Sequence, residues 1–91
     1  ELYDELVRDF IPEAEESVSA LNGALASGHL ETVKGAAHKI RGAAGNLRIE
    51  ELQQVAGEIE DACEESGDLN AIRKNAELMG ATVAELKGLV T

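Results

Sequence analysis

His38 stands in a stretch of sequence whose residue types favour chemistry at an exposed imidazole. In the segment VKGAAHKIRGAAGNLR (residues 33–48), glycines flank the histidine at positions 35, 42 and 45. On a helix that turns by about 100° per residue, Gly35, Gly42 and Gly45 share one strip of surface with His38. Each glycine inside a helix costs about 1 kcal/mol relative to alanine. Three of them indicate a function, because a strip without side chains leaves the ring open to the active site of another protein.

Cationic residues surround the same ring, and no acidic residue lies between Val33 and Ile49. The cations of this window are Lys34, Lys39, Arg41 and Arg48. The window has a charge of +4, whereas the whole chain has a formal net charge of −10. A neutral imidazole is a nucleophile near neutral pH, and cations one turn away can pair with the oxygens of a phosphoryl group. The pattern therefore predicts a nucleophilic histidine that carries an anionic group.

Helical periodicity predicts the elements that position this histidine. Apolar residues recur every three or four positions in five segments, and no sustained alternation typical of strands is present. The first segment is short and is expected to end before Pro12, because proline disfavours helix on its N-terminal side. The apolar positions of the longer segments cover residues 14–25, 30–47, 52–63 and 72–90. Short connections between them favour an all-α, antiparallel up-down four-helix bundle, with the short additional N-terminal helix packed over one end.

Composition limits the classes of partner and the compartment. The 91 residues are expected to form a single helical domain over 1–91, excised from a longer multidomain protein because the chain starts at Glu1. The one cysteine, Cys63, excludes an internal disulfide and favours the cytoplasm; we interpret it as a small core hydrophobe. The excess of 18 acidic over 8 basic residues makes nucleic acid and acidic membranes poor partners. We expect a monomer.

The residues around His38 resemble the motif of histidine-containing phosphotransfer (HPt) domains, His-x-Leu-Lys-Gly-Ser/Ala-Ser/Ala-x-x-Leu-Gly. The corresponding residues 38–48 read HKIRGAAGNLR. The longer stretch AAHKIRGAAGNLRIEELQQVAGEIE is similar to the C-terminal HPt modules of bacterial hybrid sensor histidine kinases, including the Arc-type anaerobic sensors. Arg41 stands at the lysine of the motif, and Gly42 stands at the glycine that opens space beside the ring. Arg48 replaces the last glycine of the motif.

The resemblance implies a phosphorelay intermediate. His38 would accept a phosphoryl group on Nε2 from the phospho-aspartate of a response-regulator receiver domain and pass it to an aspartate of another receiver. The receiver would supply Mg²⁺ and most catalytic groups, so the domain is expected to need no metal or other cofactor and to have no autonomous kinase activity. The docking surface is predicted to include Gly35, Gly45 and Arg48, and the ring environment to include Lys34, Lys39, Arg41 and Gly42.

Glu60 is the position at which the resemblance leaves two interpretations. In some relatives a glutamine at this position hydrogen-bonds Nδ1 of the imidazole. A carboxylate there would hold the ring but repel an attached phosphoryl group. We favour a Glu60 that points into solvent, with Gln53 and Gln54 as nearby residues that could bind the ring instead.

The sequence is also compatible with other functions. The phosphotransfer domain of a chemotaxis-type kinase shares the bundle and the motif, and a non-phosphorylated helical docking module would leave the three glycines unexplained. A kinase dimerisation domain usually has an acid directly after its histidine, where this chain has Lys39. A metal-binding bundle would need Glu-x-x-His motifs, but Gly35 and Ala26 stand three residues before His38 and His29. We interpret His29 as a loop residue.

Overall fold

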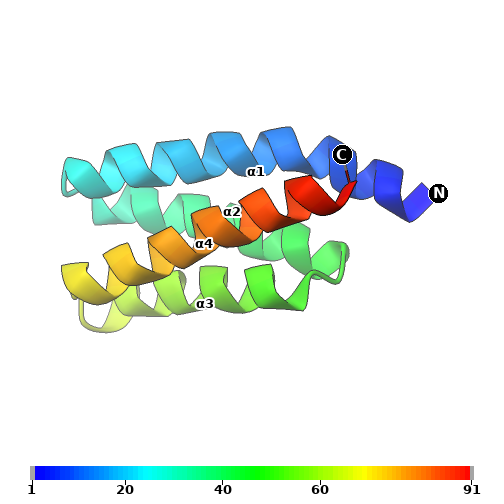
Figure 1. The fold of residues 1–91 in the computed structure, drawn as a ribbon. Coiled ribbons are helices and arrows are strands. Elements are labelled where there is room, and N and C mark those ends of the chain that lie inside the picture. The colour runs from blue at the N-terminus through cyan, green and yellow to red at the C-terminus, as the bar shows by residue number, and fades with distance from the viewer. Residues whose placement is uncertain (1, 91) are drawn as a thin grey trace.

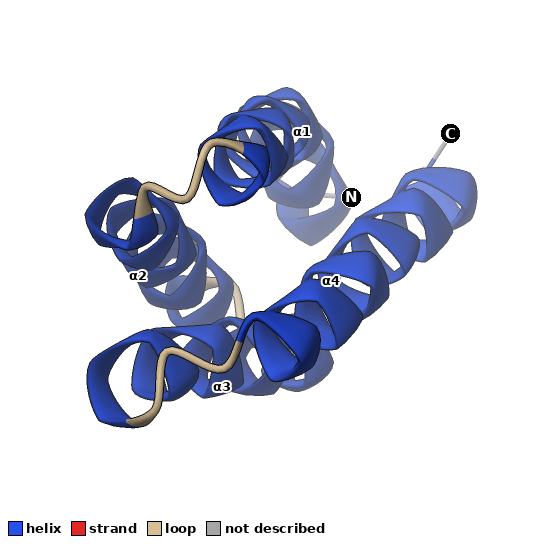
Figure 2. Cartoon of the chain, turned by 90° about the vertical axis from the view of Figure 1, so that its left-hand side faces the viewer, coloured by secondary structure: helices blue, strands red, loops and turns tan. Residues whose placement is uncertain are grey.

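A computed structural model describes residues 2–90, which fold into four helices without any strand in this range. The helices are α1 (Leu2–Ala26), α2 (Leu30–Asn46), α3 (Glu50–Glu65) and α4 (Leu69–Val90). Successive helices run in opposite directions (Figure 1), and each packs against the two that adjoin it around the bundle (Figure 2). This arrangement confirms the predicted all-α, antiparallel up-down four-helix bundle. No helix within the described range is long and apolar enough to cross a membrane.

The expected break at Pro12 is absent, and α1 continues through it from Leu2 to Ala26. A proline inside a helix removes one backbone hydrogen bond and costs about 3 kcal/mol. Val7 and Phe10 before it and Ala14 after it are nevertheless buried on the same face of α1. Burial of one large apolar side chain contributes about 1.5–3 kcal/mol, so the continuous apolar face offsets the local cost. The prediction of a separate N-terminal helix was therefore wrong.

The core fixes the rotation of α2, the helix that carries His38. Buried aliphatic side chains from all four helices form one cluster. The buried positions of α2 are Val33, Ala37, Ile40 and Ala44, which have the predicted spacing. Since this apolar stripe faces inward, the opposite face of α2, with His38 on it, is held toward solvent.

Three inter-helix turns use a left-handed residue just after a helix end. Gly28 and Gly67 occupy this position after α1 and α3, with φ of 76° and 63°. After α2 the position is occupied by Arg48, with φ of 60°. The N–H groups of Arg48 and Ile49 donate to the carbonyl oxygens of Gly45 and Ala44 at 3.1 and 2.9 Å, the pattern of a Schellman cap. Arg48 therefore replaces the motif glycine at a position where the backbone itself favours glycine.

Candidate functional site

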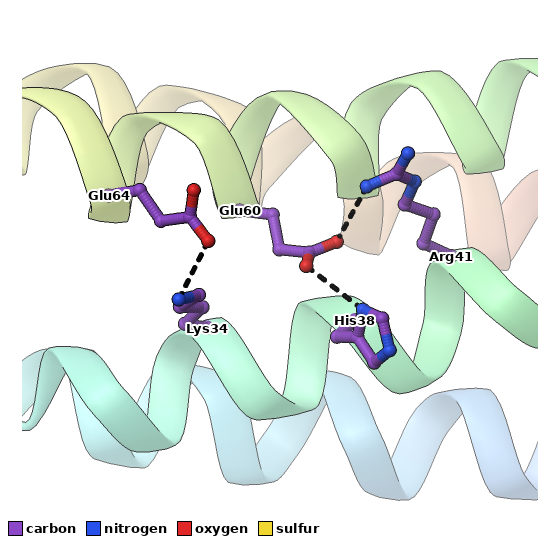
Figure 3. A network of polar contacts seen from close by, with 5 residues as sticks. All are labelled: Lys34, His38, Arg41, Glu60 and Glu64. Carbon is purple, nitrogen blue, oxygen red and sulfur yellow. Dashed lines mark hydrogen bonds and ion pairs between the residues drawn. The ribbon is translucent and has the colours of Figure 1, made fainter.

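His38 and Glu60 are hydrogen-bonded to each other across the seam between α2 and α3. The Nδ1 atom of His38 lies 2.9 Å from Oε2 of Glu60, and Nη1 of Arg41 donates to Oε1 of the same carboxylate at 3.1 Å (Figure 3). The side chain of His38 is 74% exposed, whereas that of Glu60 is 11% exposed. The expectation that Glu60 points into solvent was therefore wrong. The residue instead supplies the buried anchor of an exposed ring.

A matched spacing on the two helices produces these contacts. The α2 residues that face α3 follow one another at intervals of four, three and four, and so do their α3 partners in the reverse direction. From Lys34 onward the facing pairs are Lys34 with Glu64, His38 with Glu60, Arg41 with Gly57, and Gly45 with Gln53. Once an antiparallel α2–α3 pair is assumed, this complementary spacing in the sequence is the signal that could have placed Glu60 beside the histidine.

The ionisation state of Glu60 determines which ring nitrogen of His38 carries the proton and which has the lone pair. Burial raises the pKa of Glu60, but the hydrogen bonds from Arg41 and His38, and the positive charges beside it, outweigh burial and leave the pKa below its usual value. The carboxylate is therefore ionised at neutral pH and can only accept hydrogen bonds. We infer from this network that Nδ1 carries the proton of the neutral ring. The lone pair then lies on Nε2, which Figure 3 shows on the side of the ring away from Glu60.

Two of the four cations in residues 33–49 are paired with acidic residues of α3. The Nζ atom of Lys34 lies 2.7 Å from Oε1 of Glu64, and this hydrogen bond raises the pKa of Lys34. Arg41 is paired with Glu60. The structure thus brings Lys34 and Arg41 to the ring as members of ion pairs. The window is strongly cationic in sequence, but α3 neutralises part of that charge in space.

Lys39 and Arg48 have different surroundings. Lys39 is exposed, and within the described residues it forms no hydrogen bond or ion pair. It lines hollows between α1 and α2, on the side of His38 that faces away from α3. Arg48 lies beyond the end of α2, in the turn to α3. Lys39 is consequently the cation of the window that adjoins His38 without a partner in residues 2–90.

The three glycines of the strip have two different structural roles. A Cβ atom at Gly35 or at Gly42 would meet nothing within 4 Å, so both positions are open to solvent beside the ring, as predicted. A Cβ atom at Gly45 would lie 3.0 Å from Nε2 of Gln53. Gly45 therefore permits a close contact between α2 and α3. Gln53 lies against this glycine and not at the ring, and the ring's partner is Glu60.

The remaining candidate residues show no site of their own. His29 lies in the turn before α2 as its N-cap residue, as predicted, and is exposed. Cys63 is half-buried against the core, and burial raises the pKa of its thiol, which makes it a weak nucleophile at neutral pH. Within residues 2–90, no group of three or more histidine, cysteine or acidic side chains is arranged to hold a metal ion.

Chemically, the site presents one nucleophilic nitrogen on a flat, accessible surface. A carboxylate behind the ring fixes its tautomer and orientation, and it can stabilise positive charge that develops on the ring.

A family model described as the Hpt domain matches residues 5–89. No curated protein and no solved structure gives a significant match to the chain.

Proposed function

Because the chain belongs to the Hpt domain family and is therefore a histidine phosphotransfer domain of phosphorelays, we propose that His38 is the residue that carries the phosphoryl group. One observation supports this assignment above the others. The ring of His38 is exposed, while its Nδ1 atom is held 2.9 Å from the buried carboxylate of Glu60. His29, the other histidine, lies in a turn without such an anchor.

In the proposed reaction the phosphoryl donor is an aspartyl phosphate of a response-regulator receiver domain. The Nε2 lone pair of His38 forms a bond to phosphorus, and the acyl phosphate P–O bond breaks with its electron pair returning to the aspartate carboxylate. The Nδ1 proton stays on the ring, which becomes a phosphorylated imidazolium. The carboxylate of Glu60 accepts the Nδ1 hydrogen bond throughout and stabilises the positive charge formed on the ring. Transfer to a second receiver aspartate reverses these steps.

The domain itself supplies the nucleophile and its orientation. In this proposal the receiver supplies Mg²⁺ and the groups that stabilise the transferring phosphoryl, and the domain acts as a cytoplasmic monomer without kinase activity of its own. Gly35 and Gly42 leave room for the receiver to approach the ring, since a side chain at either position would project into open space beside it.

The test is phosphoryl transfer from a defined donor. A panel of purified receiver domains would be phosphorylated with radiolabelled acetyl phosphate in the presence of Mg²⁺, freed of excess donor, and mixed with the chain. We expect label on the chain that is labile to acid and stable to base, the behaviour of phosphohistidine, and none on His38→Gln. Because the ring is exposed, this variant should retain the helical circular dichroism of the wild type.

Three outcomes would contradict the proposal. Labelling of the His38→Gln variant would show that the phosphoryl group is carried elsewhere. Labelling by ATP with a separate kinase domain, but by no receiver, would favour the phosphotransfer domain of a chemotaxis-type kinase. If neither donor labels a folded chain, a non-phosphorylated docking module becomes the better description.

A further inference from the structure

Arg41 reaches from α2 to the carboxylate that anchors His38. Its Nη1 atom donates to Oε1 of Glu60 at 3.1 Å, while Nδ1 of His38 lies 2.9 Å from Oε2 of the same residue. Figure 3 shows the guanidinium group directed toward α3, whereas Nε2 of the ring lies on the side away from Glu60. The two contacts use different oxygens of one carboxylate, so Arg41 can influence the ring through Glu60.

The buried position of Glu60 gives this contact its importance. The side chain of Glu60 is 11% exposed, and a carboxylate in such a place is costly unless an opposite charge is paired with it. A neutral imidazole donates a hydrogen bond but brings no charge. Within residues 2–90, Arg41 is the permanently charged side chain that pairs with Glu60, because Lys34 is bound to Glu64 instead. We therefore expect Glu60 to lose its ionisation or its position behind the ring when Arg41 is removed.

Gly57 supplies the space across which Arg41 reaches Glu60. It lies in the interior of α3, where glycine is a poor helix former. A Cβ atom at this position would lie 3.7 Å from Nε and 3.8 Å from Cδ of Arg41, so the arginine side chain lies against the bare backbone of the glycine. An alanine would make an ordinary contact there, but a longer side chain would occupy the space that the arginine crosses.

These contacts form a series from Gly57 through Arg41 and Glu60 to His38. We propose that Arg41 is a positioning residue that holds the Glu60 carboxylate behind the ring and so keeps Nε2 free for the phosphoryl group, and that Gly57 makes room for it. In this role the guanidinium group is engaged with Glu60 and is not the partner of the transferred phosphoryl oxygens. The role rests on the proposed function, in which His38 carries the phosphoryl group.

The tautomer of His38 tests this role before any transfer takes place. The unphosphorylated chain would be labelled with ¹⁵N in histidine and studied at a pH at which the imidazole is neutral, where the ¹⁵N shifts show which ring nitrogen carries the proton. We expect the proton on Nδ1 in the wild type, and a larger share of rings with the proton on Nε2 in Arg41→Ala. An unchanged tautomer in Arg41→Ala would overturn the proposal.

Two substitutions of Gly57 test the space beside the arginine with the same readout. Gly57→Leu introduces a good helix former without a polar group that could replace the guanidinium, and it should change the tautomer in the same direction as Arg41→Ala. Gly57→Ala, which adds only an ordinary contact, should keep the wild-type tautomer. A wild-type tautomer in folded Gly57→Leu would overturn the role of Gly57. If Gly57→Leu does not fold, Arg41→Ala still tests the rest of the series.

A double-mutant cycle shows whether Arg41 acts through Glu60. The rate constant for transfer to His38 would be measured at saturating concentrations of the fastest receiver of the panel, for Arg41→Ala in the wild-type chain and in a Glu60→Ala chain. We expect Arg41→Ala to lower it by about fivefold in the wild-type chain and by less than about twofold in the Glu60→Ala chain. The matched control is Lys87→Ala, which breaks the exposed ion pair with Glu15 between α4 and α1 and should leave the rate unchanged.

The alternatives give different results. An equal loss in both chains would mean that Arg41 acts directly on the phosphoryl group or on the receiver, and it would overturn the proposal. So would a loss in Lys87→Ala as large as that in Arg41→Ala, because overall charge would then be the cause. Circular dichroism would confirm that each variant is folded, which we expect because the Arg41 side chain is half-exposed. A failure of the proposed function is distinct, since the wild type would then accept no label while the tautomer would still report on Arg41.

Discussion

Glu60 of α3 lies 2.9 Å from Nδ1 of His38 and holds the exposed imidazole from behind. The carboxylate is ionised and cannot donate, so the proton belongs to Nδ1 and the lone pair to Nε2. Arg41, bonded to the other oxygen of Glu60 at 3.1 Å, holds the carboxylate in turn. The contact between Glu60 and His38 therefore joins a buried anion to a nucleophile that faces solvent.

Replacing Glu60 with glutamine tests whether the negative charge of its carboxylate stabilises the phosphorylated ring. The amide oxygen can still accept the Nδ1 hydrogen bond, but the negative charge beside the phosphorylated ring is lost. Hydrogen bonds to charged groups are stronger than neutral ones by about 1 kcal/mol. We therefore expect the equilibrium constant for transfer from receiver to His38 to fall by about fivefold. The distribution of label at equilibrium measures it, and an unchanged or larger constant would show that Glu60 only orients the ring.

The lowered pKa of Glu60 predicts a pH dependence of stability. Because the folded-state pKa lies below the unfolded one, the ionised carboxylate stabilises the fold at pH values above the ordinary carboxyl range. This contribution is lost as the pH falls through the folded-state pKa. Urea unfolding at pH 7 and at progressively lower pH should show Glu60→Gln less stable than wild type at pH 7, with a difference that shrinks in acid. A difference that stays constant with pH would contradict the assigned ionisation.

Arg48 offers a stabilising substitution. A non-glycine residue in the left-handed region costs about 1–2 kcal/mol of conformational strain. Substitution by glycine removes this strain, but it also increases the conformational entropy of the unfolded chain, which cancels part of the gain. Arg48→Gly should therefore raise the free energy of unfolding by about 0.5–1 kcal/mol. The matched control is Gly28→Ala, at the equivalent position after α1, which should lower it by a similar amount. If Arg48→Gly is neutral or destabilising in urea unfolding, the arginine side chain makes a contribution that the backbone conformation does not reveal.

Two glycine substitutions distinguish access of a receiver to the ring of His38 from packing between α2 and α3. Gly42→Gln places a side chain in open space beside the ring, so the bundle should remain folded while transfer from a receiver slows. Gly45→Gln instead forces the end of the Gln53 side chain aside, so its effect should appear in stability as well as in rate. Circular dichroism, urea unfolding and the transfer rate distinguish the two. Wild-type transfer by Gly42→Gln would contradict the role of the bare strip.

The sequence predicted the elements of the fold because apolar periodicity depends only on residues within one helix. The stripe of Val33, Ala37, Ile40 and Ala44 is sufficient to place His38 on the outer face of α2, as observed. The predicted helix break at Pro12 was wrong because it considered only the local cost of proline in a helix. It left out the buried apolar face that continues on both sides of Pro12. That comparison needs the packing of α1 against its neighbours.

The site was only partly predictable for the same reason. His38 and its glycines belong to one helix and could be recognised from their spacing. The partners of Lys34 and Arg41, and the inward position of Glu60, depend on the register between α2 and α3. Residues 33–49 contain no acidic residue, but in the structure they lie beside Glu60 and Glu64 of α3. The sequence therefore overestimated the positive charge around His38.

NMR of the ring nitrogens tests directly whether Nε2 of His38 is the phosphoryl acceptor while Nδ1 keeps its proton against Glu60. The chain would be labelled with ¹⁵N in histidine, phosphorylated by a receiver, and studied by NMR for coupling between ³¹P and the ring nitrogens. We expect phosphorus on Nε2 of His38, with a proton on Nδ1 before and after transfer. Phosphorus on Nδ1, or on neither nitrogen of His38 in a labelled chain, would contradict it.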